Sequence, residues 1–208
     1  MGIPPYMLRL AMPAEADTIK ELVTETAQWL RGKDTDQWAT PWPDATGRDK
    51  RIEDDVLDGH TWIVWDDDIC AGTISLDLRY PLDAEANPVW PVHRLGERAL
   101  YVHRVVVRRC YKGQGLGAGL LDWASAKAVD LIGKPLLRVD VWTSNSALHK
   151  YYMAKGFDRC GYREPDELPN YPARALFERR ISPNGHSTAK YLFYEDEDPL
   201  SLSGAVMR

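Results

Sequence analysis

A segment near the middle of the chain places glycines at alternate positions directly before an apolar repeat of helical spacing. Gly113, Gly115 and Gly117 alternate, and Gly119 follows. Three basic side chains stand at the entrance of this loop: Arg108, Arg109 and Lys112. A glycine turn between a strand and a helix can aim backbone N–H groups and the positive end of the helix dipole at one point. We therefore expect the loop to bind a phosphate or pyrophosphate, although a plain tight turn with solvated charges would use the same residues.

The spacing narrows the choice of phosphate ligand without settling it. A P-loop needs Lys-Ser or Lys-Thr after its glycines, and neither follows here. Gly113-x-Gly115-x-x-Ala118 matches the dinucleotide fingerprint literally, and Asp140 could serve as the ribose acid. That fingerprint belongs to the first strand–helix turn of a nucleotide domain, whereas further elements are predicted before this one. Dinucleotide binding therefore stays as a minor alternative.

Mixed strands and helices are predicted around the loop. The expected strands cover residues 7–11, 61–65, 69–78, 100–107, 136–142, 157–162 and 173–181. The expected helices cover 13–31, about 46–57, 116–132 and 146–155. Because hairpins and crossovers both occur, the fold class is α/β or α+β with a mixed sheet. Residues 1–181 form one domain, and the polar, acidic extension 182–208 is expected to pack only through its aromatic stretch 191–194.

Bulk composition excludes several function classes. The 208 residues carry a formal net charge of −5, which argues against a nucleic-acid partner. No apolar run approaches the length of a membrane span, and the first residues lack the features of a signal peptide. The three cysteines are widely separated and show no metal-ligand spacing. We expect a cytoplasmic protein without a bound metal or a membrane partner.

Two motifs in sequence order resemble the GNAT superfamily of N-acetyltransferases. The first is the strand and loop over 105–117, in which Lys112 takes the position of a Gln or Arg in the family signature Gln/Arg-x-x-Gly-x-Gly/Ala. The second is Asn145-x-x-Leu148-x-x-Tyr151-Tyr152-x-x-x-Gly156-Phe157. The resemblance covers roughly residues 7–181. It implies a mixed, mostly antiparallel sheet, flanked by helices, whose two central strands (here 100–107 and 136–142) splay apart around acetyl-CoA.

The resemblance also implies which residues hold acetyl-CoA. Backbone groups of Val105 and Val107 would pair with the pantetheine arm as an added strand would. Asn145 would hydrogen-bond the cofactor, and it could cap the following helix at the same time. The pyrophosphate would lie on the glycine loop, formed by Lys112, Gly113, Gln114, Gly115, Leu116, Gly117 and Ala118.

Three residues are candidates for the chemistry. Tyr152 matches the family tyrosine that protonates or hydrogen-bonds the departing thiolate, although it could simply pack a short helix. His103 is the first choice of general base, because strand periodicity places it on one face with Val105 and Val107. Asp140 interrupts an apolar strand, and it could orient His103, act as the base or complete a structural ion pair, which we favour. Arg138 shares its face by strand periodicity, and His103 or Arg104 on the neighbouring strand could also reach it. A chain of water molecules could also replace a dedicated base.

The acceptor is expected on the side of the loop between the first two helices. Trp29 and Trp38, with nearby acidic residues, would form an aromatic pocket suited to a cation, and Trp142 and Tyr171 could also line the cleft. The expected acceptor is a primary amine on a small molecule or peptide. The sequence leaves open a homodimer, and it leaves open a non-catalytic acyl-CoA-binding module as an alternative to the enzyme.

Overall fold

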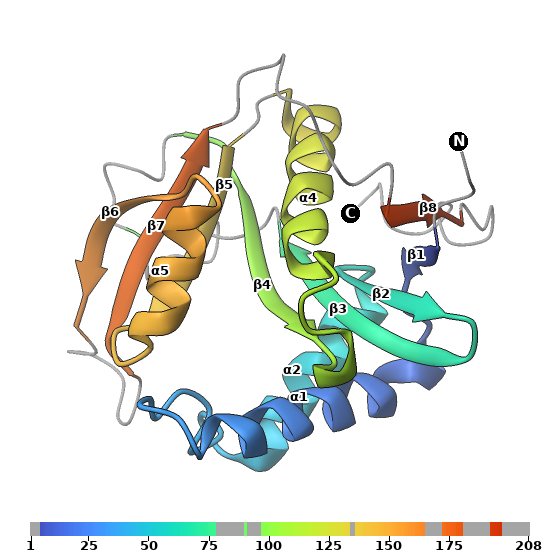
Figure 1. The fold of residues 1–208 in the computed structure, drawn as a ribbon, viewed down its shortest axis with the longest axis horizontal. Helices are drawn as coiled ribbons and strands as arrows, with labels where there is room; N and C mark the ends of the chain where they lie inside the picture. The colour runs from blue at the N-terminus through green and yellow to red at the C-terminus, as the bar shows by residue number, and fades with distance from the viewer. Residues whose placement is uncertain are drawn as a thin grey trace.

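A twisted sheet with helices on both faces forms the body of the protein (Figure 1). The computed structural model describes residues 5–77, 90, 97–133, 136–164, 172–180 and 192–196. The strands are β1 (Tyr6–Leu10), β2 (Thr61–Asp66), β3 (Ile69–Asp77), β4 (Leu100–Val107), β5 (Leu136–Trp142), β6 (Asp158–Arg163), β7 (Arg174–Arg180) and β8 (Phe193–Glu195). The helices are α1 (Ala16–Leu30), α2 (Ala45–Leu57), α4 (Leu116–Ile132) and α5 (Ser146–Ala154), with 3-10 turns η1 (Pro13–Glu15) and η2 (Arg109–Tyr111).

The eight strands form a single sheet of order β6-β7-β5-β4-β3-β2-β1-β8. Among the described strands, β4–β5 and β1–β8 pair in parallel, and the remaining neighbours pair antiparallel. The predicted mixed, mostly antiparallel sheet is therefore confirmed, and so are the predicted strands and helices, with shifts of one to a few residues at their ends.

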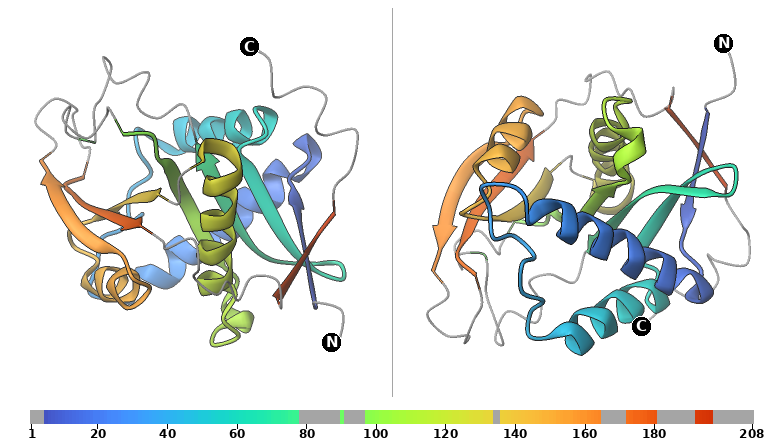
Figure 2. Two further views of the ribbon diagram at one scale, coloured as in Figure 1. Left: turned by 90° about the horizontal axis from the view of Figure 1, so that it is seen from above. Right: turned by 60° about the horizontal axis from the view of Figure 1, so that its bottom comes forward.

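The two faces of the sheet are covered by different helices. Helices α4 and α5 lie on one face, and α1 and α2 lie on the other (Figures 1 and 2). Strand β3 shows the alternation that makes this possible, because Ile74 and Leu76 join the core under α4 while Thr73 and Ser75 point to the opposite face. Each strand of this region therefore serves two packed layers.

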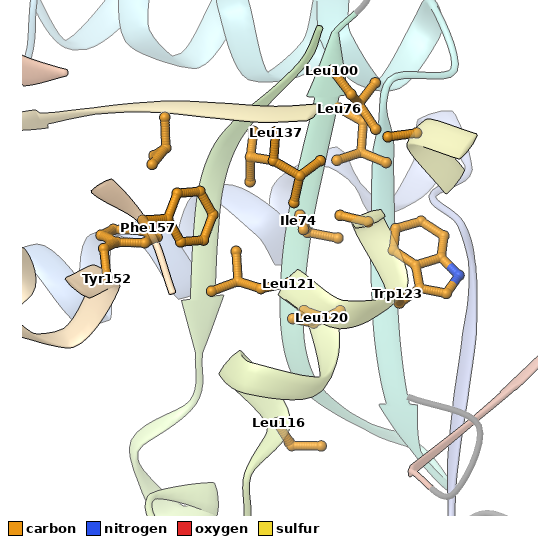
Figure 3. Packing of buried hydrophobic residues seen from close by; sticks show 14 of the residues in the cluster. Ile74, Leu76, Leu100, Leu116, Leu120, Leu121, Trp123, Leu137, Tyr152 and Phe157 are labelled. Atoms are coloured by element: carbon orange, nitrogen blue, oxygen red, sulfur yellow. The ribbon is translucent and has the colours of Figure 1, made fainter. Parts of the chain in front are cut away.

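Helix α4 packs the core next to the glycine loop. It begins after Gly115 and ends at Gly133, two residues with left-handed backbone conformations. Leu116, Leu120 and Leu121 are each at most 1% exposed, and burial of one such side chain contributes roughly 1.5–3 kcal/mol. Figure 3 shows these leucines directed toward the strands. The first turn of the helix is thus held rigidly against β3 and β4.

The C-terminal segment returns to the sheet. Strand β8 pairs in parallel with β1 and covers its outer edge. Phe193 is buried in the main core, whereas Tyr194 is 44% exposed. The prediction that the stretch 191–194 packs is therefore confirmed for Leu192 and Phe193 and wrong for Tyr194, and Tyr191 lies outside the described residues. The expectation that the extension packs only through this stretch is also wrong, because Glu195 bonds to α4.

Candidate functional site

A cleft opens where β4 and β5 diverge. These two strands, both described throughout, pair only at Leu100–Leu137 and Tyr101–Arg138. Beyond these pairs they separate (Figure 1), and a cleft of about 750 Å³ lies among β4, the glycine loop, α5 and the segment after α1. Val105 and Val107 line it. Their backbone groups on the β5 side have no strand partner, and an extended ligand could therefore pair with them.

A β-bulge in β4 changes which side chains face this cleft. Ser75 pairs with His103 and Thr73 with Val106, so two residues of β4 stand opposite one residue of β3. Arg104, within the bulge, has a φ of 46°, in the left-handed region. The extra residue reverses the alternation.

The prediction that His103 shares a face with Val105 and Val107 is therefore wrong. Because Ser75 and Thr73 share a face, their partners His103 and Val106 also share one, and Val106 packs with α1 and α2. Val105 and Val107 pack against the opposite core, under α4. His103 is not among the described residues that line the cleft.

The glycine loop forms one wall of the cleft as predicted. Gly113 and Gly115 have φ values of 85° and 82°, which L side chains rarely adopt. No side chain of the described residues caps the start of α4, so its first N–H groups are available to an anion. The loop residues that line the cleft are Lys112, Gly113, Gly115, Leu116, Gly117 and Ala118.

Positive charge dominates the cleft. Its basic lining residues are Lys33, Arg108, Arg109, Lys112 and Lys155. Asp34 is the one carboxylate among the described lining residues. Such a surface favours a polyanionic ligand at the glycine loop.

Gln114 differs from its neighbours in the loop. Its side-chain oxygen accepts a hydrogen bond from the Tyr6 hydroxyl, and it is not among the described residues that line the cleft. Tyr111 packs edge-on against Tyr6 and donates a 2.7 Å hydrogen bond to Asp66. Burial, helped by Asp66, raises the pKa of Tyr111 to about 12. Both tyrosines therefore stay protonated at neutral pH and hold the outer side of the loop.

Two tyrosines of α5, Tyr151 and Tyr152, line the cleft. Tyr152 is 4% exposed, and its ring packs on Phe157 and Phe177 at centroid distances of 5.2 and 6.2 Å; Figure 3 shows Tyr152 beside Phe157. Its hydroxyl forms no hydrogen bond with another described residue, although Tyr152 lines the cleft. Burial, chiefly, raises the pKa of the Tyr152 phenol above its usual value of 10. The phenol therefore remains a hydrogen-bond donor over the whole neutral range.

Tyr151 is a lining residue that sequence reasoning assigned no role. Its hydroxyl lies against Gly117, where an added Cβ would be 2.7 Å away from it. Burial also raises the pKa of this phenol. The pair of adjacent tyrosines was the only feature of the sequence that could have indicated Tyr151. The sequence does not show which of the two faces the loop, because the orientation of the helix depends on its packing.

Asn145 joins the two walls of the cleft. Its Oδ1 accepts a 2.9 Å hydrogen bond from the Leu148 N–H, which is the N-cap of α5. Its Nδ2 donates a 2.8 Å bond to Gln37, in the segment after α1. The capping prediction is therefore confirmed, and the amide also ties that segment to α5.

The predicted acceptor tryptophans are placed differently from one another. Trp29 and Trp38 line the cleft, but the Arg109 guanidinium lies 3.8 Å from the centroid of the Trp29 ring. Trp142 is 8% exposed and is not among the described lining residues, and its ring lies beside Arg174. The prediction that Trp142 lines the cleft is wrong, because its side chain faces the ion pair of β5 and β7. Tyr171 lies outside the described residues.

Asp140 forms a structural ion pair rather than facing the cleft. Its carboxylate lies 2.9 Å from the Arg174 guanidinium on the neighbouring β7. The expected partner Arg138 instead donates to the Tyr101 hydroxyl and pairs with Glu178. The predicted kind of interaction is present, with a cross-strand arginine in place of the one two residues away.

Comparisons with known proteins identify the family. The sequence model of the Acetyltransferase (GNAT) family matches residues 23–157. The chain belongs to this family. GNAT proteins are N-acetyltransferases, and the chain is therefore an acyltransferase. The uncharacterized N-acetyltransferase YesJ of Bacillus subtilis is 29% identical over 151 residues, which span 73% of this chain and 81% of YesJ.

Solved structures agree with the GNAT fold. A GNAT-family acetyltransferase from Listeria monocytogenes superposes with a TM-score of 0.63 at 21% identity, over 85% of this chain and 95% of that one. The protein yncA of Salmonella typhimurium, solved with its cofactor acetyl-CoA, superposes with a TM-score of 0.57 at 15% identity, over 87% and 96%. At these identities the likeness concerns the fold alone.

Among the residues that the structure describes, no group of three or more His, Cys, Asp and Glu side chains could hold a metal ion. No described helix is long and apolar enough to cross a membrane.

Proposed function

We propose that this GNAT acetyltransferase binds acetyl-CoA in the cleft and transfers the acetyl group directly to a primary amine within a ternary complex. The observation that carries the proposal is Tyr152, which lines the cleft and whose hydroxyl bonds to no other described residue. A phenol hydroxyl that bonds to no protein group can donate its hydrogen bond to a ligand in the cleft. The solved complex of yncA with acetyl-CoA supports this choice of donor.

The cofactor would lie along the wall made by β4 and the start of α4. The pantetheine arm would pair with the free backbone groups of Val105 and Val107. The pyrophosphate would accept hydrogen bonds from the N–H groups after Gly115, next to Lys112. Arg109 would add charge to the same ligand, whereas the Arg108 guanidinium is paired with Glu25 at 3.1 Å. The basic lining of the cleft suits the phosphates of CoA and explains why an acidic protein can bind it.

The reaction needs a neutral amine, a stabilised oxyanion and a stabilised thiolate. The amine nitrogen attacks the thioester carbon, and the carbon–sulfur bond then breaks. The proton that the nitrogen loses balances the proton that the sulfur gains. Tyr152 would donate its hydrogen bond to the sulfur as negative charge develops there.

The raised pKa of Tyr152 sharpens this role. A thiol has a pKa of about 8.5, below that of the buried phenol. Complete transfer of the phenol proton to the thiolate is therefore uphill, and a hydrogen bond that strengthens in the transition state is favoured over a free tyrosinate. Tyr152 would thus stabilise the departing thiolate mainly by donating this hydrogen bond, and the proton that the amine loses would reach the sulfur through water.

The acceptor amine would enter beside the segment after α1. Asp34 and Trp38 line this part of the cleft, and a carboxylate and an aromatic ring suit an ammonium group. Trp29 contributes the wall on which Arg109 lies. His103 and Asp140 are not assigned a proton-transfer step, because the structure directs both away from the lining; the amine would react as its neutral fraction or through water.

Calorimetry and a thiol-release assay test the proposal together. The purified protein should bind CoA, and acetyl-CoA with a panel of primary amines should release free thiol in the presence of at least one amine. Gly115→Val, which forces a side chain onto a φ of 82°, should abolish binding of CoA. Binding of NADH without binding of CoA would contradict the proposed cofactor, and binding of CoA without transfer to any amine would contradict the proposed catalysis.

A further inference from the structure

We infer that the C-terminal segment 192–196 positions the acetyl-CoA loop from behind, through Leu192 and Phe193. The inference rests on the proposed function, because it assigns to this segment the support of the same loop. Residue 192 is 73 positions from Gly119 along the chain, yet the Leu192 side chain lies against Gly119 in the first turn of α4.

The glycines of this turn face two different partners. A Cβ added at Gly117 would lie 2.7 Å from the Tyr151 hydroxyl, on the cleft side. A Cβ added at Gly119 would lie 2.6 Å from Leu192 Cδ1 and 3.0 Å from Phe193 Cε2. Residues two apart on a helix point to nearly opposite sides. Gly117 therefore serves the cleft, and Gly119 serves the contact with the C-terminal segment.

Further contacts hold the segment in this place. The Glu195 carboxylate accepts a 2.9 Å hydrogen bond from Trp123 Nε1 and pairs with Lys127 at 2.6 Å, both on α4. Phe193 is 6% exposed within the main core. The two contacts of Glu195 tie β8 to α4, and its pairing with β1 holds it at the edge of the sheet (Figure 2).

The segment also reaches the loop by a second route. Phe193 pairs with Tyr6 on β1, and the Tyr6 hydroxyl donates to Gln114 in the middle of the loop. A Cβ at Gly115 would lie 4.0 Å from Leu192 Cδ1, which is ordinary contact distance. The outer side of the loop and the first turn of α4 are thus supported at residue 114 by β1 and at residue 119 by Leu192 and Phe193. A loop held in its binding conformation before the ligand arrives binds that ligand more tightly.

A double-mutant cycle between Gly119 and Leu192 tests the contact. Glycine to alanine inside a helix normally stabilises it, so Gly119→Ala alone should be stabilising if the C-terminal segment does not matter. We expect the opposite: a lower Tm and a Kd for CoA about three- to tenfold higher. In the background of Leu192→Ala the added methyl group gains room, and the penalty of Gly119→Ala should shrink or change sign.

Three readouts separate positioning from general stability. Leu192→Ala should raise the Kd for CoA and the KM for acetyl-CoA about three- to tenfold, with kcat at saturation within about twofold of the wild type. Amide hydrogen exchange of residues 113–121 should become faster in the same variant. Tyr194→Ala removes an exposed side chain of the same strand and should change none of these values.

The outcomes that overturn the inference differ from those that overturn the proposed function. Wild-type protein that does not bind CoA would contradict the proposed function. Wild-type binding with an unchanged Kd in Leu192→Ala, together with unchanged exchange of residues 113–121, would overturn the inference. Additive effects of Gly119→Ala and Leu192→Ala would overturn it as well, because the two side chains would then not be coupled.

Discussion

Removal of one oxygen atom from Tyr152 gives the sharpest test of the proposed chemistry. Tyr152→Phe keeps the ring, which packs on Phe157 and Phe177, and removes a hydroxyl that bonds to no other described residue. The free energy of unfolding should therefore change little. The Kd for CoA should also change little, because the proposed bond forms fully only when charge develops on the sulfur.

The expected loss in rate follows from the strength of one charge-assisted hydrogen bond. Such a bond contributes about 1.5–3 kcal/mol, and about 1.4 kcal/mol corresponds to a factor of ten in rate. We therefore expect kcat of Tyr152→Phe to fall about 10- to 150-fold. A larger loss, toward the upper range of general acid catalysis of about 10⁴-fold, would indicate complete proton transfer instead.

The assay measures free thiol released from acetyl-CoA at saturating concentrations of both substrates. Tyr162→Phe is the matched control, because Tyr162 is an exposed tyrosine of β6, and this variant should retain the wild-type kcat. Tyr151→Phe should act instead on the KM for acetyl-CoA, since the Tyr151 hydroxyl lies at Gly117. A kcat of Tyr152→Phe within about threefold of the wild type, with CoA binding intact, would refute the proposed role.

Three further expectations follow from the same cleft. Burial raises the pKa of Tyr152 above 10, so its donor form is complete below that pH; kcat should not fall between about pH 7 and about pH 9.5, and a decline with an apparent pKa below 10 in the pH–rate profile would contradict this. Gly117→Ala should raise the KM for acetyl-CoA about tenfold or more, because the new Cβ would lie 2.7 Å from the Tyr151 hydroxyl. A wild-type KM in steady-state kinetics would contradict this steric overlap. Asn145→Ala removes the cap bond to Leu148 and should lower the free energy of unfolding by about 0.5–2 kcal/mol in urea titrations, whereas Asn145→Ser should recover part of that loss.

Local patterns were sufficient for most of the fold. The apolar spacing of α4 and the left-handed glycines that bound it are readable from the sequence, because both depend on neighbours within a few residues. The alternation of β3 between two cores is equally local. The same applies to Asn145, whose capping bond joins residues three apart.

The bulge at Arg104 was not readable, and it decides the role of His103. Strand periodicity assumes one residue opposite one, and β4 places two residues opposite one residue of β3. No residue type in β4 predicts the bulge. The residue with the left-handed φ of 46° is an arginine, Arg104, and not the glycine that would normally mark such a position. Because of this single extra residue, His103 lies on the face covered by α1 and α2 and not on the face of Val105 and Val107.

Contacts between distant segments of the chain were also not predictable from the sequence. The pair Tyr6–Gln114 and the pair Asn145–Gln37 each join residues 108 positions apart. Gln114 and Asn145 were both predicted to contact the cofactor. In the structure the amide of each side chain forms a hydrogen bond with another protein side chain. Such residues shape the cleft by fixing its walls, and a sequence motif cannot distinguish that use from direct contact with a ligand.

The glycine motif combines these two kinds of information. Four glycines occupy alternate positions from residue 113 to residue 119, and from the sequence they are interpreted together as a phosphate-binding loop. The structure divides them: Gly113 and Gly115 supply left-handed turns, Gly117 gives room to a tyrosine in the cleft, and Gly119 gives room to the returning C-terminal segment. The last of these has a partner that lies outside the motif, on the far side of the helix from the ligand. A glycine repeat can therefore be longer than the ligand requires when a second segment of the chain packs against the same turn.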